Sequence, residues 1–169
     1  MIQNLFVVKD GIALVNQNFG ECHSLTQDID LITSYISALQ MISEEITGSS
    51  MRSINFDEIT FHFYKDTNKL GLFYILVVDI NDNQGDISNK IRKISELFNQ
   101  LYFQKIEHFN GNISQFENFG EILIEKNIAQ INCGENSECV SCSNRNNEGK
   151  FIEDFKSDRE KHLARFKSA

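Results

Sequence analysis

The spacing of apolar residues changes several times along the chain, and these changes constrain the fold more than any other feature. Two short apolar runs, 5–8 and 12–15, are separated by Lys9-Asp10-Gly11. Asp and Gly tolerate the positive φ of tight turns, so this segment predicts an antiparallel hairpin. From residue 28 to about residue 46, apolar residues recur every three or four positions, which predicts a helix. The apolar face of that helix is expected to comprise Ile32, Tyr35, Ile36, Leu39, Ile42 and Ile46.

The middle of the chain returns to strand patterns. Residues 52–56 predict a short strand, and in 58–64 the apolar positions alternate with polar ones, as in a strand buried on one face. In this pattern His62 falls on the polar face, where an exposed surface histidine is expected. Residues 72–80 are almost all apolar, which is typical of a central strand that is covered on both faces.

Two more helices are predicted after the last strand. Asp86 is the expected cap of the first, in which Ile87, Ile91, Ile94, Phe98 and Leu101 share one face. Ser114-Gln115-Phe116-Glu117 fits the capping-box pattern and predicts the start of the second. The full order is strand, strand, helix, three strands, helix and helix. It predicts an α+β fold with one five-stranded antiparallel sheet flanked by helices.

The distribution of charge predicts two parts within the chain. The 169 residues carry a formal charge of −8, which argues against nucleic acid as a partner, since phosphates need a basic surface. Residues 1–129 hold nine basic and 17 acidic side chains, whereas residues 130–169 hold seven of each. We therefore expect a folded domain over residues 1–129 and an appended cysteine-containing segment over residues 130–169.

The sequence carries no signal for a transmembrane segment or for secretion. The longest apolar run, 72–78, is far shorter than the ~20 residues needed to cross a bilayer. Residues 1–5 lack the basic segment and the small-residue cleavage site of a secretory signal. The expected location is therefore the cytoplasm.

The predicted element order resembles that of longin domains. The segments that carry the resemblance are 5–15 in the opening hairpin, 36–39 and 46–48 in the first helix, and 61–66 in a later strand. More specifically, residues 1–127 look like the longin-like proteins encoded by Asgard-type archaea. Roadblock domains, which are close relatives, begin with an additional helix.

The resemblance implies a non-catalytic module that binds other proteins. Longin and roadblock proteins typically act with small Ras-like GTPases or in membrane trafficking, or they bind a peptide in the groove beside the first helix. The implied partners are a small Ras-like GTPase or another longin or roadblock protein, with a homodimer as a further alternative. The resemblance fixes no individual site residue.

A search for catalytic motifs finds none that predicts an enzyme. The chain has no GxxxxGK[ST] loop, no GxGxxG turn after a strand and no GxSxG elbow. Its four histidines are isolated from one another in sequence. The adjacent acidic residues Glu44-Glu45, Asp57-Glu58 and Glu153-Asp154 are typical of solvated surface. The expectation is a protein that is not an enzyme.

The cysteines near the C-terminus form the sharpest cluster of chemically active residues. Cys133, Cys139 and Cys142 lie within ten residues, and the last two form a C-x2-C pair that can hold one zinc ion. A structural zinc site needs a fourth ligand, for which His162 is the candidate, with Cys22 or His23 as alternatives. A zinc-binding or thiol-redox protein is therefore the alternative function, and free reduced thiols are the simpler interpretation.

The last twenty residues, 150–169, place Phe151, Phe155, His162 and Phe166 at near-helical spacing among basic side chains. This pattern predicts a short amphipathic helix, which would allow peripheral contact with an anionic membrane or with a partner. Interspersed acidic residues weaken its basic face, so a solvated helix is the favoured interpretation.

Overall fold

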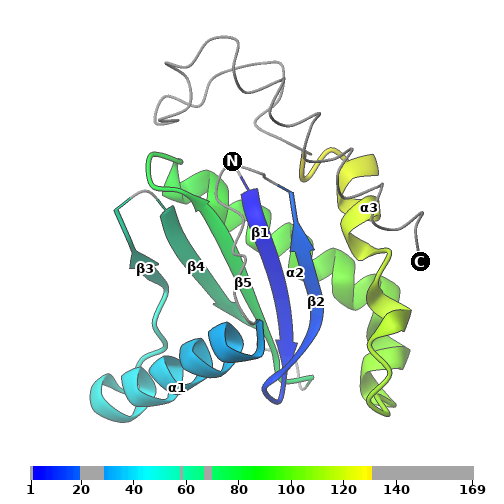
Figure 1. Cartoon of the computed structure of the whole chain (residues 1–169), viewed down its shortest axis with the longest axis horizontal. Helices are drawn as coiled ribbons and strands as arrows, with labels where there is room; N and C mark the ends of the chain where they lie inside the picture. Colours follow the sequence, from blue (N-terminus) through cyan, green and yellow to red (C-terminus); the bar gives the residue numbers. More distant parts are fainter. Residues whose placement is uncertain (1, 20–28, 58, 67–69, 131–169) are drawn as a thin grey trace, which may run out of the picture. The chain divides into compact units, whose positions relative to one another are not determined.

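In a computed structural model of the chain, a five-stranded sheet forms the centre of the fold (Figure 1). The structure describes residues 2–19, 29–57, 59–66 and 70–130. The strands lie in the order β2-β1-β5-β4-β3, and all neighbours are antiparallel. Their bounds are β1 Ile2–Lys9, β2 Ile12–Asn18, β3 Ser53–Asn55, β4 Ile59–Lys65 and β5 Leu72–Asp79. The predicted α+β class and its five-stranded antiparallel sheet are confirmed.

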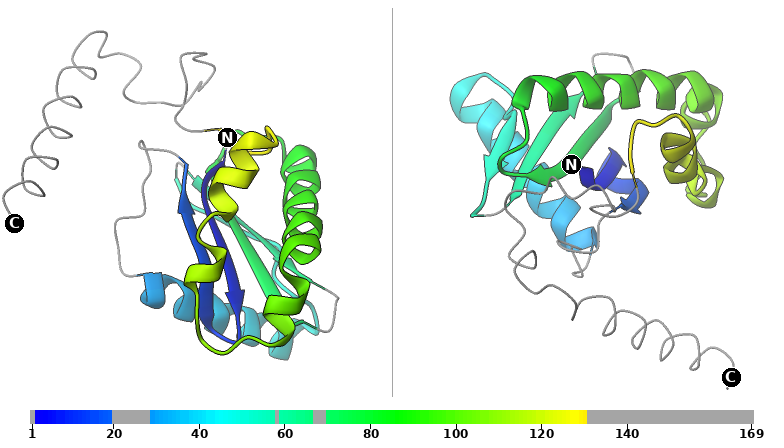
Figure 2. Two further views of the ribbon diagram at one scale, coloured as in Figure 1. Left: turned by 90° about the vertical axis from the view of Figure 1, so that its right-hand side faces the viewer. Right: turned by 90° about the horizontal axis from the view of Figure 1, so that it is seen from above.

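Helices cover both faces of this sheet (Figure 2). Helix α1 (Ile29–Thr47) lies on one face, and α2 (Gln84–Glu107) lies on the other. A 3-10 turn, η1 (Ser114–Phe116), and the short helix α3 (Phe119–Glu125) follow α2 and pack into the same core as α2. The element order is therefore the predicted one, with η1 added between the last two helices.

The opening hairpin forms for the predicted reason. Asp10 and Gly11 adopt φ values of 50° and 83°, which reverse the chain between β1 and β2. The pairing of β1 with β2 shifts register between Val7 and Val8, which is a β-bulge. β1 also pairs with β5 on its other side, so it is a central strand and is buried along almost its whole length.

The sheet separates two hydrophobic clusters of unequal size. The larger cluster lies under α2, η1 and α3 and includes Tyr74, Phe98 and Phe119, which are fully buried. The smaller cluster lies on the α1 face, where Phe61, Phe63 and Ile36 are buried. Most of the apolar burial is therefore on the face of the sheet opposite α1.

Two predicted helix starts were wrong. α2 begins one turn earlier than expected, because the side-chain oxygen of Asn83, not Asp86, accepts hydrogen bonds from the backbone N–H groups of Gly85 and Asp86 at 2.8 and 3.2 Å. Ser114 makes no side-chain cap for η1 and bonds Asn112 instead. In a capping box the α-helix starts directly after the Ser, whereas α3 begins only at Phe119, five residues after Ser114.

Residues 131–169 lie outside the described residues, so the predicted boundary at residue 129 and the predicted amphipathic helix over 150–169 stay predictions. Within the described part of the chain, no helix is long and apolar enough to cross a membrane.

Candidate functional site

Helix α1 presents an apolar surface to solvent. Among the described residues, eleven large apolar side chains are exposed, and five of them lie on this one helix. They are between 52% and 77% exposed and comprise Leu31, Tyr35, Met41, Ile42 and Ile46. With about 100° of rotation per residue, all of them except Met41 fall within about 60° of one another around the helix axis. Leu31, Tyr35, Ile42 and Ile46 form a stripe, which we call the outer face of α1, and Met41 lies to one side of it.

The side of α1 that packs on the sheet is less apolar than this outer face. Its buried residues are Thr33, Ile36 and Gln40. Tyr35, Ile42 and Ile46, which the sequence pattern assigns to the same apolar face as Ile36, are therefore exposed, whereas Ile36 is buried. The sequence pattern identified the helix correctly, but Gln40 lies on the inward side, where it bonds Met51 in the segment that follows α1, and several apolar residues lie on the outward side.

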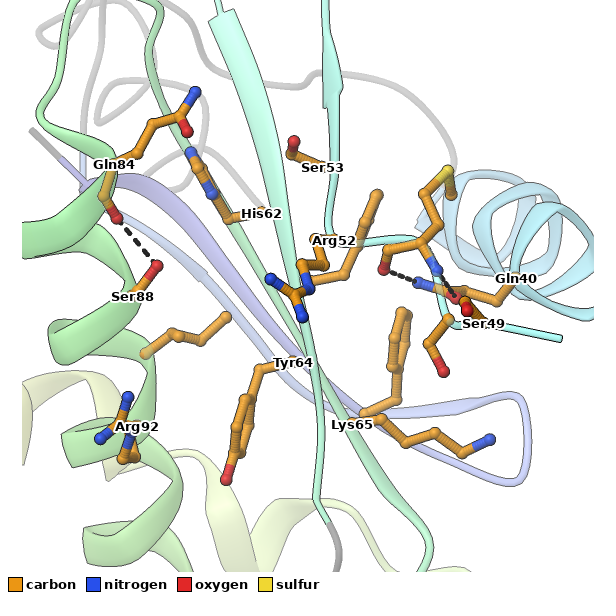
Figure 3. Close-up of a pocket in the computed structure, with 15 residues that line it drawn as sticks. Gln40, Ser49, Arg52, Ser53, His62, Tyr64, Lys65, Gln84, Ser88 and Arg92 are labelled. Carbon is orange, nitrogen blue, oxygen red and sulfur yellow. Dashed lines mark hydrogen bonds between the residues drawn. The ribbon is translucent and has the colours of Figure 1, made fainter. Parts of the chain in front are cut away.

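A pocket of about 700 Å³ lies at the edge of the sheet where β3 begins (Figure 3). β3 pairs only with Thr60–His62 of β4, and its first residue, Ser53, lies opposite His62, so Phe63, Tyr64 and Lys65 extend past the start of β3. Residues from α1, from the segment before β3, from β4 and from α2 all line the pocket. In Figure 3, Arg92 and Ser88 project from α2 on one side, and Gln40 marks the α1 side.

Hydrogen bonds fix the segment that carries Arg52. The Gln40 side chain donates to the Met51 carbonyl oxygen at 2.7 Å and accepts from the Met51 N–H at 3.0 Å. The Phe63 N–H donates to the Arg52 carbonyl oxygen at 2.8 Å. The backbone of Arg52 is therefore tied to α1 on one side and to β4 on the other.

Among the described residues that line the pocket, the side chains that carry a full charge are positive. Among the fifteen described residues that line it, none is Asp or Glu. Lys65 is paired, because its ammonium group donates to Glu44 at 2.8 Å. Hydrogen bonds from Lys65 and from Ser50 lower the pKa of the Glu44 carboxyl group. Within the described part of the chain, Arg52 and Arg92 make no ion pair or hydrogen bond through their side chains.

His62 also lines the pocket, and it is not the exposed residue that was predicted. Its side chain is largely buried on the α2 face of the sheet, and burial lowers its pKa. The strand pattern suggested a polar face because Thr60 and His62 alternate with apolar residues, but α2 covers that face. A pKa below the ordinary value keeps the imidazole neutral at pH 7.

The predicted metal ligands cannot be placed. Cys133, Cys139, Cys142 and His162 lie outside the described residues, as do the alternative ligands Cys22 and His23. Within the described ranges, no group of three or more His, Cys, Asp or Glu side chains is positioned to hold a metal ion. The zinc and thiol-redox interpretations therefore stay predictions.

Sequence reasoning missed Arg52 and Arg92. They lie 40 residues apart in the chain, so no motif connects them. One signal was present: they are the two arginines of the first 130 residues, in a segment with a strong excess of acidic side chains.

A scan against protein-family models and a search of curated proteins find no match to this chain.

Proposed function

We propose that the chain is a longin-like, non-catalytic protein-binding module that docks a small Ras-like GTPase on the outer face of α1. The observation that carries the proposal is the apolar stripe on α1, which gathers four of the eleven exposed large apolar side chains of the described residues on one face of one helix. The sheet order β2-β1-β5-β4-β3, with one helix on one face and the later helices on the other, supports the longin-like interpretation.

The outer face of α1 is a feature that a monomer does not need. Single exposed apolar residues are normal, but a contiguous exposed patch commonly marks an interaction site. Fully burying a large apolar side chain contributes about 1.5–3 kcal/mol, so covering the exposed half of the four residues in the stripe contributes about 4 kcal/mol. That gain is comparable to the cost of bringing two proteins together. Polar contacts around the stripe must therefore supply the remaining affinity.

The partner class follows from the longin resemblance, since proteins of that kind act with small Ras-like GTPases and in trafficking. Another longin or roadblock protein, or a second copy of this chain, could cover the same stripe, and each gives a different result in the test below. The preference for a nucleotide state would define the role. Preferential binding of the nucleotide-free GTPase indicates an exchange factor, whereas preference for the GTP form indicates an effector or an activating subunit.

The test is a titration of the full chain with the small Ras-like GTPases of the same organism, loaded with GDP or with a non-hydrolysable GTP analogue. The test variant is Tyr35→Ser/Ile42→Ser, which removes the centre of the stripe. Both side chains are more than half exposed, so the fold should be unaffected. The matched control is Phe103→Ser, which removes a half-exposed aromatic residue from α2 instead.

We expect saturable binding of at least one GTPase, weakened about tenfold or more by the α1 variant and by less than twofold by the control. Absence of binding to every GTPase in both nucleotide states would contradict the partner class. Equal weakening by the two variants would contradict the assignment of the surface. If light scattering detects a dimer that only the α1 variant dissociates, a second copy covers the stripe and the GTPase proposal fails.

A further inference from the structure

The pocket where β3 begins gathers positive side chains that have no ion-pair partner among the described residues, in an acidic domain. Both arginines of the first 130 residues line it, although residues 1–129 carry a net charge of −8. On such a surface an arginine readily finds a carboxylate partner, yet Arg52 and Arg92 have none among the described residues. Two arginine side chains line one pocket whose described lining has no acidic residue, and guanidinium groups in such surroundings favour an anionic ligand.

The two arginines are held on fixed backbone. The carbonyl oxygen of Arg52 is bonded to the Phe63 N–H of β4, and the preceding residue is anchored by Gln40. Arg92 follows Ile91, which is buried, so packing sets the face that α2 presents to the pocket. Only the side-chain rotamers then need to be ordered when a ligand binds, which lowers the entropic cost of binding.

The remaining lining defines the kind of anion. Two unit positive charges match a phosphate monoester, which carries −1.5 to −2 near pH 7, better than a carboxylate, which carries −1. Ser53, Tyr64 and Gln84 provide further polar groups, and His62 is a neutral imidazole. The volume of about 700 Å³ lies within the range of small-molecule sites and exceeds the size of a bare phosphate ion.

We propose that this pocket binds a small soluble phosphate monoester, with Arg52 and Arg92 holding the phosphate and the body of the ligand lying against Tyr64 and Met51. The proposal does not depend on the outer face of α1, which is a separate surface. It adds a ligand to the proposed binding module and leaves its partner unchanged.

The test is an NMR titration of the ¹⁵N-labelled full chain with phenyl phosphate, which combines a phosphate monoester with an apolar ring. Inorganic phosphate and benzoate are titrated in parallel to separate the contributions of the dianion and the ring. Arg52→Gln and Arg92→Gln each remove one charge from an exposed side chain. Lys93→Gln is the matched control, because Lys93 neighbours Arg92 on α2 but does not line the pocket.

We expect saturable shifts in amides of residues 49–53 and 88–92, with phenyl phosphate binding more tightly than either simpler anion. Each arginine variant should weaken binding about tenfold, while Lys93→Gln should change it by less than twofold. Absence of saturation up to about 10 mM phenyl phosphate would overturn the proposal. So would equal weakening of binding by Lys93→Gln, or chemical-shift changes located away from the pocket. Dispersed spectra of the free variants show that the fold is intact.

Discussion

Truncation of Phe98 tests how the main core is built. Phe98 is fully buried in α2 and contacts four other aromatic rings, with centroid distances between 4.8 and 6.1 Å. These rings come from β5, α2, η1 and α3 and belong to Tyr74, Tyr102, Phe116 and Phe119. Replacement of a buried Phe by Ala costs about 3–5 kcal/mol through lost transfer energy and the cavity left behind. We expect Phe98→Ala to fall at the upper end, because the aromatic contacts are lost as well.

The assay is urea unfolding followed by circular dichroism, with Phe103→Ala as the control. Phe103 lies on the same helix but is half exposed, so its truncation should cost less than about 1 kcal/mol. A typical domain has a free energy of unfolding of only about 5–15 kcal/mol, so Phe98→Ala should remove a large part of the total. Similar losses for the two variants would refute the orientation of α2 and the position of the core.

Three further predictions concern single residues or the cysteine segment. Asn83→Ala should lower the free energy of unfolding, measured in urea, by about 1 kcal/mol, because the cap of α2 is lost, and Asp86→Asn should lower it by less. A larger loss for Asp86→Asn than for Asn83→Ala would favour Asp86 as the cap, as the sequence predicted. Burial lowers the pKa of His62, so as the pH falls the unfolded chain takes up a proton on this residue before the folded chain does. The free energy of unfolding should therefore be highest above pH 6.5 and fall as the pH drops below 6.5. His62→Gln should make this loss smaller between about pH 7.5 and 5.5, and an unchanged loss would contradict the burial of His62. Zinc binding by Cys133, Cys139 and Cys142 predicts about one equivalent of metal in protein purified without chelator, and less than about a tenth of an equivalent with fully reduced thiols would exclude it.

The strands and helices could be predicted because their signals are local. The alternation of apolar residues identified β4, the continuous apolar run identified β5, and Asp10-Gly11 identified the hairpin. The antiparallel sheet could then be predicted because most connections between consecutive strands are too short for a parallel arrangement. These signals act between near neighbours in the chain, so a single sequence contains them.

The errors arose where tertiary contacts override a local pattern. The polar face predicted for β4 is covered by α2, which buries His62. Much of the predicted apolar face of α1 points outward, and Gln40 faces inward, where it bonds Met51. Neither contact is visible in the periodicity of the segment concerned.

The candidate sites were the least predictable part. Arg52 and Arg92 come together only because the chain before β3 and the helix α2 meet at the same edge of the sheet. Sequence spacing favoured the cysteines of residues 133–142, whose clustering is local, over a pocket built from five separate segments. A site of that kind becomes visible only when the fold is known.

Hydrogen exchange in the presence and absence of a bound small GTPase tests the proposed docking surface most directly. We expect the backbone amides of α1, residues 29–47, to exchange more slowly in the complex and those of η1 and α3 to be unchanged. Slower exchange confined to α2 or α3, with α1 unchanged, would contradict the proposal that the outer face of α1 binds the partner.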